Sequence, residues 1–358
     1  MDQITQTQLR GVQMLLDYCI SRDKEIFNKT LEEGPIDWGY LSYFADINGL
    51  MGMLWSMTDG LEDSRVPFRV AVNLKNWVIK HRRRWELYSE ILQKMHIAKI
   101  TNDTPILLKG AALKQTIYSD EPVLRNIGDV DLLFTPQDII NVEKWLEEEG
   151  FWLRGGKNGP TAFKRTSEDR LVIDLHIGDP SKTKRASNSE DIYNIFIKNT
   201  IPVNKENSHR MISYELAIVH ACKHLCEHEE DFRKILLQTE FRLFWLVDIH
   251  LLLNKVNIQE TIKLAKDLNW LNEFKRCMWY LQKIFNVNLP IEIKNLQLNN
   301  DLEIKEVKTP VGNFEWPWDI KTRMLLVDRD AWLSLQMGSQ GKRSDWYTAK
   351  EGDKSPKL

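Results

Sequence analysis

The first hundred residues carry a helical hydrophobic pattern. After Pro35 apolar side chains recur three or four positions apart, and after Pro67 the same spacing continues as one long stripe from Val70 to Met95. Apolar residues at this spacing share one face of an α-helix. Residues 1–103 are therefore predicted to form a helical N-terminal region.

The pattern becomes strand-like at Thr104-Pro105, where short apolar runs replace the helical stripe. Helices are expected between these runs, one after Gly110 and one that stops at Gly150. An order of strand, helix, strand, helix and further strands predicts a small mixed sheet with helices on one face, within residues 104–205. The predicted strands cover residues 106–108, 129–134, 151–154, 161–164 and 170–177.

Helical spacing returns at Ser213, which is a suitable N-cap with Glu215 in the first turn. Residues 206–300 are predicted as a helical C-terminal region, with helices to about residue 286, and residues 301–358 as an irregular tail. The fold class expected from these patterns is α+β, a small mixed β-sheet with helices, flanked by N- and C-terminal helical regions.

Composition and charge narrow the functional classes. Hydrophobic residues make up 42% of the chain and charged residues 28%, as in soluble globular proteins, and the formal net charge of −2 gives no general attraction for nucleic acid. The four cysteines lack the spacing of a disulfide framework. With no signal-peptide pattern and no apolar run near the ~18 residues of a membrane span, we expect a cytoplasmic protein without membrane contact.

Three aspartates lie in the strand-like runs. Side chains alternate along a strand, so Asp129 and Asp131 are expected on the same face. An adjacent strand could bring Asp174 to that face. Three clustered carboxylates repel one another unless a cation neutralises them, and all-oxygen ligation suits Mg²⁺. The pattern therefore predicts a metal site beside the Gly110 turn.

With these residues, the segment from Leu107 to Phe134 resembles the polymerase β-type nucleotidyltransferase superfamily. It is most similar to an uncharacterised bacterial branch with the pattern LLKGxAL…DxDLL…DLH. The residues that carry the resemblance are Lys109-Gly110, Leu113, Tyr118, Arg125, Asp129, Asp131, Leu132-Leu133 and Asp174-Leu175-His176. Gly110-Ala111 stands where the superfamily usually has glycine and serine, which removes a hydroxyl that can contact phosphate.

The resemblance implies a minimal nucleotidyltransferase core and a separate role for each of the aspartates. Asp129 and Asp131 would hold two Mg²⁺ ions, or Mn²⁺ in their place, and Asp174 would hold the acceptor-side ion and help remove the acceptor proton. The predicted nucleotide-binding residues are Lys109, Gly110, Ala111 and Arg125.

A further group of residues is predicted either to contact the acceptor or to hold the catalytic residues in position. His176 shares the strand face of Asp174 and is expected to orient it or to contact the acceptor. On one predicted helix, His220, Lys223 and His224 are expected to border the cleft, with a structural role as the alternative. Asp248 interrupts an apolar run and is expected to pair with one of these histidines or with Lys223.

The function expected is transfer of a nucleoside monophosphate from a nucleoside triphosphate to an acceptor hydroxyl or phosphate. A small molecule or modified peptide is favoured as the acceptor over tRNA, because the run His81-Arg82-Arg83-Arg84 is the only dense basic cluster. Three alternatives remain: a toxin-like enzyme that modifies tRNA, transfer of a sugar from a nucleotide sugar, and a catalytically degenerate module that binds a nucleotide.

Overall fold

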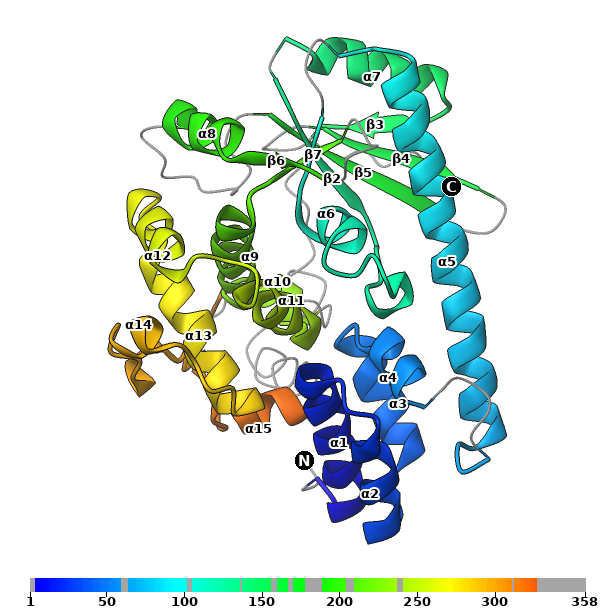
Figure 1. Ribbon diagram of the computed structural model, residues 1–358, viewed down its shortest axis with the longest axis vertical. Helices are drawn as coiled ribbons and strands as arrows, with labels where there is room; N and C mark the ends of the chain where they lie inside the picture. Colours follow the sequence, from blue (N-terminus) through cyan, green and yellow to red (C-terminus); the bar gives the residue numbers. More distant parts are fainter. Residues whose placement is uncertain are drawn as a thin grey trace.

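The computed structural model begins with five helices (Figure 1). The structure describes residues 4–58, 64–101, 105–135, 137–155, 160–166, 170–177, 189–203, 209–236, 241–310 and 312–326. The helices are α1 (Gln6–Ser21), α2 (Glu25–Glu33), α3 (Trp38–Ile47), α4 (Met51–Met57) and α5 (Phe68–Ile97). In α1 a capping box forms between Thr5 and Gln8, which satisfies the first free backbone N–H groups. The helical pattern predicted for this region is confirmed.

The centre of the chain forms a mixed seven-stranded sheet, with strand order β3-β4-β5-β2-β1-β7-β6. The strands are β1 (Ile106–Leu107), β2 (Val130–Phe134), β3 (Trp152–Arg154), β4 (Thr161–Arg165), β5 (Arg170–Ile177), β6 (Thr200–Pro202) and β7 (Arg210–Ile212). Between them lie α6 (Lys109–Gln115), η1 (Pro122–Leu124), α7 (Ile139–Glu148) and α8 (Ser189–Lys198). The pairs β2–β5 and β1–β7 are parallel and the other pairs are antiparallel. The predicted α+β class is confirmed.

Successive side chains along each strand point to opposite faces of the sheet. Leu107, Leu132 and Ile173 point to a core that they share with α5 and α7. Leu133 and Ile212 point the other way, to a core that includes α8 and the helices after the sheet. Helices therefore pack on both faces, and the prediction of helices on one face was wrong because it did not anticipate that the C-terminal helices return to the sheet.

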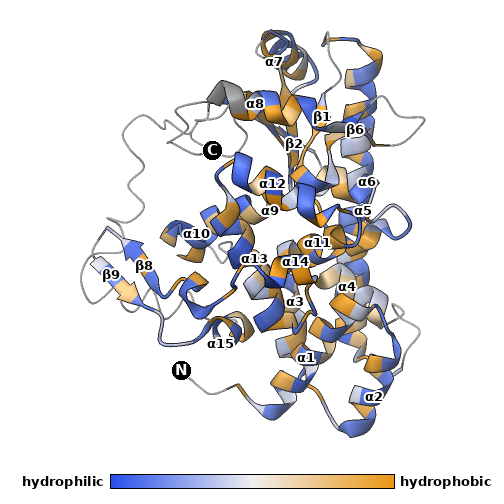
Figure 2. Ribbon diagram, turned by 60° about the vertical axis from the view of Figure 1, so that its left-hand side comes forward, coloured by the Kyte–Doolittle hydropathy of each residue, from blue (hydrophilic) through white to orange (hydrophobic). Residues whose placement is uncertain are grey.

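Helices follow the sheet as predicted. They are α9 (Tyr214–Glu229), α10 (Phe232–Leu236), α11 (Leu243–Leu253), α12 (Ile258–Asp267), α13 (Leu271–Phe285) and α14 (Ile291–Lys294). Ser213 caps α9 by accepting a hydrogen bond from the backbone N–H of Leu216, as its position in the sequence predicted. The apolar faces of these helices and of the N-terminal helices turn inward and form one continuous core (Figure 2).

Several elements were not predicted. Strand β6 was missed because it contains Pro202, which argues against a strand, and β7 was missed because it lies beyond residue 205, where the helical C-terminal region was expected to begin. After η2 (Asn300–Leu302), a hairpin of β8 (Glu306–Thr309) and β9 (Gly312–Glu315) precedes α15 (Ile320–Leu325). The remainder of the predicted irregular tail, from residue 327, lies outside the described residues. Among the described residues no helix combines the length and apolarity that a membrane crossing requires.

Candidate active site

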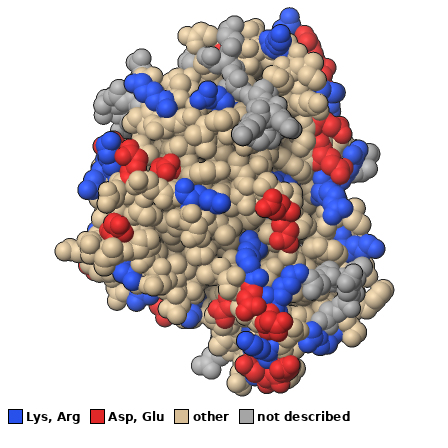
Figure 3. Space-filling model, viewed as in Figure 1, with Lys and Arg blue, Asp and Glu red and all other residues tan. Residues whose placement is uncertain are grey.

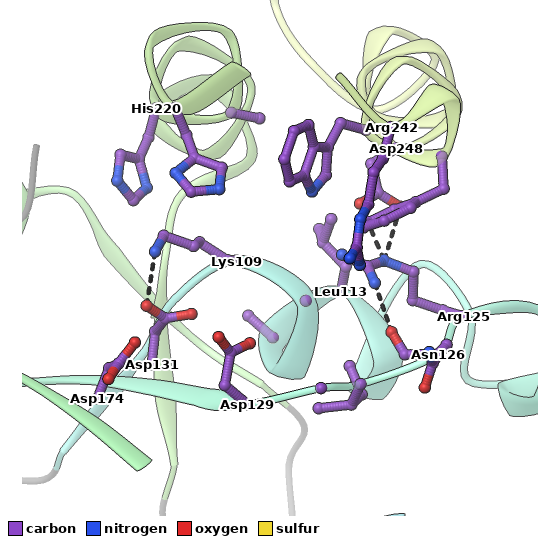
Figure 4. A pocket seen from close by; sticks show the side chains of 18 of the residues that line it. Lys109, Leu113, Arg125, Asn126, Asp129, Asp131, Asp174, His220, Arg242 and Asp248 are labelled. Atoms are coloured by element: carbon purple, nitrogen blue, oxygen red, sulfur yellow. Dashed lines mark hydrogen bonds and ion pairs between the residues drawn. The ribbon is translucent and has the colours of Figure 1, made fainter. Parts of the chain in front are cut away.

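A cavity of about 440 Å³ lies between the second face of the sheet and helices α9 and α11 (Figure 4). It contains most of the site residues predicted from sequence. These are Lys109, Gly110, Arg125, Asp129, Asp131, Asp174, His220, His224 and Asp248. The sheet supplies the aspartates, and the helices supply the histidines and Asp248.

The register of the sheet brings the carboxylates together. Asp131 on β2 is paired directly with Asp174 on β5, so their side chains lie next to each other on one face. Asp129 precedes the first residue of β2 and its side chain points into the cavity beside them (Figure 4). Strand alternation and one parallel pairing therefore place all three carboxylates on one wall of the cavity.

Asp131 is the most buried of the three carboxylates, with 5% of its side chain exposed. The Nζ atom of Lys109 lies 2.6 Å from its Oδ1, and Nε2 of His176 lies 2.8 Å from the same oxygen. Burial by itself raises the pKa of Asp131, but the Lys109 ammonium and the His176 hydrogen bond outweigh it and hold that pKa well below its usual range. Asp131 is therefore ionised.

Asp129 has the opposite environment. It stays accessible at the mouth of the cavity, yet the surrounding protein displaces much of the bulk water from its carboxyl group. This desolvation and the negative charge of Asp131 raise the pKa of Asp129 to about 6. Asp174 accepts a hydrogen bond of 2.7 Å from the Thr161 hydroxyl, which fixes one of its oxygens on the cavity wall.

In this conformation Lys109 supplies the positive charge next to the carboxylates. Among the described residues no three His, Cys, Asp or Glu side chains are arranged to hold a metal ion in this conformation, in which Asp131 bonds to Lys109 and Asp174 to Thr161. The donor types nevertheless fit a hard divalent cation, because three carboxylates share one wall and the pKa of Asp129 is raised by desolvation and by the charge of Asp131. A cation would take the place of the Lys109 ammonium on Asp131.

The turn that presents Lys109 differs from the prediction. The positive φ angle, +48°, lies at Lys109 itself and not at Gly110. A side chain with a Cβ is strained in this region, and such strain often occurs at functional sites. Gly110 is needed instead for close packing, because a Cβ there would lie 2.9 Å from Nη2 of Arg125.

Arg125 and Asp248 form a buried pair at the back of the cavity. The Nε atom of Arg125 lies 2.9 Å from Oδ2 of Asp248, and the Tyr118 hydroxyl donates a 2.7 Å hydrogen bond to Oδ1. The Arg125 guanidinium also stacks over the Phe244 ring, 4.1 Å from its centre. The prediction that Asp248 pairs with a histidine or Lys223 was wrong, because Arg125 and Tyr118 are its partners and Lys223 bonds to Glu273 instead.

Three predicted residues lie outside the cavity lining. His176 is buried behind Asp131, so it orients that carboxylate and not Asp174. Lys223 points to α13, with its Nζ 3.0 Å from Oε1 of Glu273. Ala111 is 1% exposed and packs into the core on the other face of the sheet, so a serine hydroxyl at this position would also lie in that core.

Sequence reasoning missed several residues of the lining. Arg170 could have been found, because it lies on β5 at even spacing from Asp174 and so shares its face. The others come from the helical half, where the sequence pattern does not show which face meets the sheet. These residues are His228, Lys234, Arg242, Phe244 and Trp245.

The cavity lies within the part of the chain that matches a known family. Residues 34–286 match the model of a family described as uncharacterised nucleotidyltransferase. The match extends from just before α3 to the end of α13 and includes every residue that lines the cavity. No curated protein and no solved structure matches the chain significantly.

Proposed function

Because the chain belongs to the uncharacterised nucleotidyltransferase family, and is thus a transferase that acts on a nucleotide, we propose that this cavity is its active site. The reaction proposed is transfer of a nucleoside monophosphate from a Mg²⁺-bound nucleoside triphosphate to a hydroxyl or phosphate of an acceptor. The single observation that supports it best is the pairing of Asp131 with Asp174 beside Asp129 on one cavity wall.

The three aspartates would hold Mg²⁺, or Mn²⁺ in its place. When bound, this metal neutralises charge on the phosphate oxygens and lowers the pKa of an attacking oxygen. His176 keeps Asp131 in position through its 2.8 Å hydrogen bond, so this carboxylate is oriented before any ligand enters. Asp174, which accepts a hydrogen bond from Thr161, would help remove the proton of the acceptor.

Lys109 has a second role once it leaves Asp131. Its side chain lies at the cavity wall beside the carboxylates, 16% exposed, and its ammonium is the nearest cation to them (Figure 4). In the complex with a nucleotide it would turn to a β- or γ-phosphate oxygen. Arg125 would support the site by its position and would not contact the nucleotide, because Asp248 and Phe244 already hold its guanidinium.

The acceptor we propose is a small molecule or a modified peptide. A cavity of about 440 Å³ is in the range of small-molecule sites. On the face shown in Figure 3, Lys and Arg are interspersed with Asp and Glu and form no continuous basic stripe that would bind a long polyanion. The net charge of −2 agrees with this choice.

The experiment is incubation of the protein with Mg²⁺, labelled nucleoside triphosphates and a cell extract or candidate acceptors, followed by mass spectrometry. A product heavier by one nucleoside monophosphate, with release of pyrophosphate, is expected. Asp174→Asn should abolish it and should leave the fold intact. Release of a nucleoside diphosphate from a nucleotide sugar would show sugar transfer instead. Binding of nucleotide without any product would identify a degenerate module.

A further inference from the structure

An aromatic stack lies on the same sheet face as the catalytic carboxylates, two strands away from them. The Trp152 ring on β3 stacks on the Phe163 ring on β4, with ring centres 4.4 Å apart and planes 18° apart. Phe163 is paired with Val172 on β5, a residue of the cavity lining. Directly paired residues share a face, so the stack continues the cavity wall beyond Asp174.

This stack is accessible, although large aromatic side chains are usually buried. Trp152 is 48% exposed, while most large apolar residues in the described chain are in the core. Strands lie about 4.8 Å apart and rise about 3.4 Å per residue, so the stack is on the order of 10 Å from Asp174. A molecule of moderate size can reach both.

Arginines surround the stack. The guanidinium of Arg170 lies over the Phe163 ring, 5.7 Å from its centre, and Arg170 also lines the cavity. Its cross-strand partner is Arg165, and like charges in directly opposite positions repel each other. Arg154, paired with Thr161, is exposed on the same face.

The local charge is positive even though the whole chain is slightly acidic. Across the described strands β3, β4 and β5, Asp174 is the single acidic residue, and three basic residues share the face of the stack: Arg154, Arg165 and Arg170. A planar aromatic surface with arginines at its edge recognises a flat ring that carries a negative group.

We propose that this aromatic stack, Trp152 and Phe163 with Arg154, Arg165 and Arg170, binds the acceptor, which is a small molecule with a planar ring and a phosphate or carboxylate group. The inference rests on the proposed function, because the stack lies on the side of Asp174, the carboxylate assigned to the acceptor. The ring packs against Trp152, the anionic group pairs with the arginines, and the reacting oxygen extends toward Asp174.

The test uses flavin mononucleotide, a planar ring with a phosphate, whose fluorescence is quenched when it stacks on an indole. It is titrated with the protein in the absence of nucleoside triphosphate and of divalent metal. We expect saturable quenching with the wild type. Trp152→Ala should raise the Kd by about 5- to 150-fold, the usual effect of losing one stacking partner. Trp152→Phe should retain binding, which separates lost stacking from lost folding.

The arginines are tested with riboflavin, which has the same ring without the phosphate. Arg170→Gln should weaken binding of flavin mononucleotide but leave that of riboflavin unchanged. The matched control is Ile140→Ala, which removes an exposed apolar side chain (71% exposed) on α7, a helix that packs on the other face of the sheet. It should leave both affinities unchanged.

Three results would overturn the proposal. The first is no saturable quenching of flavin mononucleotide by the wild type, and the second is unchanged affinity in Trp152→Ala. The third is tighter, salt-sensitive binding of a single-stranded oligouridylate that Trp152→Ala abolishes, because the surface would then serve a nucleic acid. Since this binding assay contains no nucleoside triphosphate, its result does not depend on transfer. Saturable flavin binding here, together with no product in the separate transfer experiment, would count against the proposed function alone.

Discussion

The two aspartates of the Asp-x-Asp motif have opposite electrostatic environments, although one residue separates them. Asp131 is buried against Lys109 and His176, and its pKa is depressed. Asp129 lies at the cavity mouth with its pKa raised to about 6, through desolvation and the repulsion of Asp131. Their substitutions are therefore expected to change stability in opposite directions.

Asp129→Asn should not destabilise the metal-free protein at pH 7. The ordinary pKa of this carboxyl is 3.8, and in the folded protein it is about 6. Between these values the folded protein binds a proton that the unfolded chain releases, so stability falls as pH rises from about 4 to 6 and does not recover above. Asparagine removes this loss. The melting temperature in a metal chelator at pH 7 should be unchanged or higher.

The same melting experiment at pH 4 serves as the control for Asp129→Asn. There the wild-type carboxyl is largely protonated in the folded protein, so the difference between the variants should shrink. A clear drop in melting temperature at pH 7 would instead assign Asp129 a structural role.

Asp131→Asn should destabilise the metal-free protein. It leaves the Lys109 ammonium, 16% exposed, without its carboxylate, and breaking a buried pair in this way costs about 3 kcal/mol. Chemical denaturation measures the loss. Both aspartate variants should lose nucleotidyl transfer. Their different effects on stability then distinguish the two residues. Wild-type stability in Asp131→Asn would show that the 2.6 Å contact contributes nothing to the free energy of unfolding.

Lys109→Ala should raise the KM for the nucleoside triphosphate more than it lowers kcat. This follows if the lysine holds a phosphate equally well in the ground state and in the transition state. Initial rates over a range of nucleotide concentrations give both constants. A fall in kcat with constant KM would show that Lys109 stabilises the charge that develops in the transition state. Unchanged kcat and KM would show that Lys109 does not act on the nucleotide.

At the scale of elements, the Arg125–Asp248 pair fixes the loop after η1 to helix α11. Both side chains are at most 9% exposed, and the residues are 123 positions apart in the chain. This pair, with Tyr118, positions the helical wall of the cavity against the sheet. Its contacts join elements that are far apart in the chain.

Asp248→Ala should therefore destabilise the whole protein, by about 3 to 5 kcal/mol, because Arg125 is left buried without a partner. Urea denaturation followed by circular dichroism measures this. The control is Lys263→Gln, which removes one partner of an exposed pair with Glu260 and should cost less than about 1 kcal/mol. Equal effects of the two variants would mean that burial of the Arg125 pair has no energetic consequence.

At the scale of the whole molecule, the N-terminal and C-terminal helices share one core, and on the face shown in Figure 3 the charged residues are dispersed. The basic run on α5 is part of this surface. Arg82 and Arg83 are exposed and do not line the catalytic cavity, and Arg83 pairs with Glu86 at 3.2 Å. Arg84 is different, since its guanidinium reaches the carbonyl of Ile127 near Asp129.

The double variant Arg82→Gln, Arg83→Gln should keep near-normal transfer to a small-molecule acceptor. Its binding of bulk tRNA should be as weak as that of the wild type across ~50 to 200 mM salt, where a true phosphate-binding surface would lose affinity steeply. Tight, salt-sensitive tRNA binding by the wild type that this variant loses would make RNA the acceptor. Arg84 is left unchanged so that the loop before Asp129 is undisturbed.

Much of the fold was predictable because its signals are local. The stripe on α5, the N-cap at Ser213 and the alternation along β2 and β5 each depend on the period of one element. The same alternation predicted that the aspartates would share a face. Strands β6 and β7 were not predicted, because Pro202 in β6 argues against a strand and β7 runs without a turn into the helix that Ser213 caps.

The sequence by itself indicated the three aspartates and Lys109 as candidate site residues, and the tertiary structure decided which of the predicted residues lie together in the cavity. Nothing local distinguishes His220, which lines the cavity, from Lys223, which points to α13, until the helices pack. The contacts of Asp131 with Lys109 and His176 join residues 22 and 45 positions apart. Such pairings follow from strand register and helix packing. These depend on burial of apolar surface across the whole chain, so the sequence of a single helix or strand does not show them.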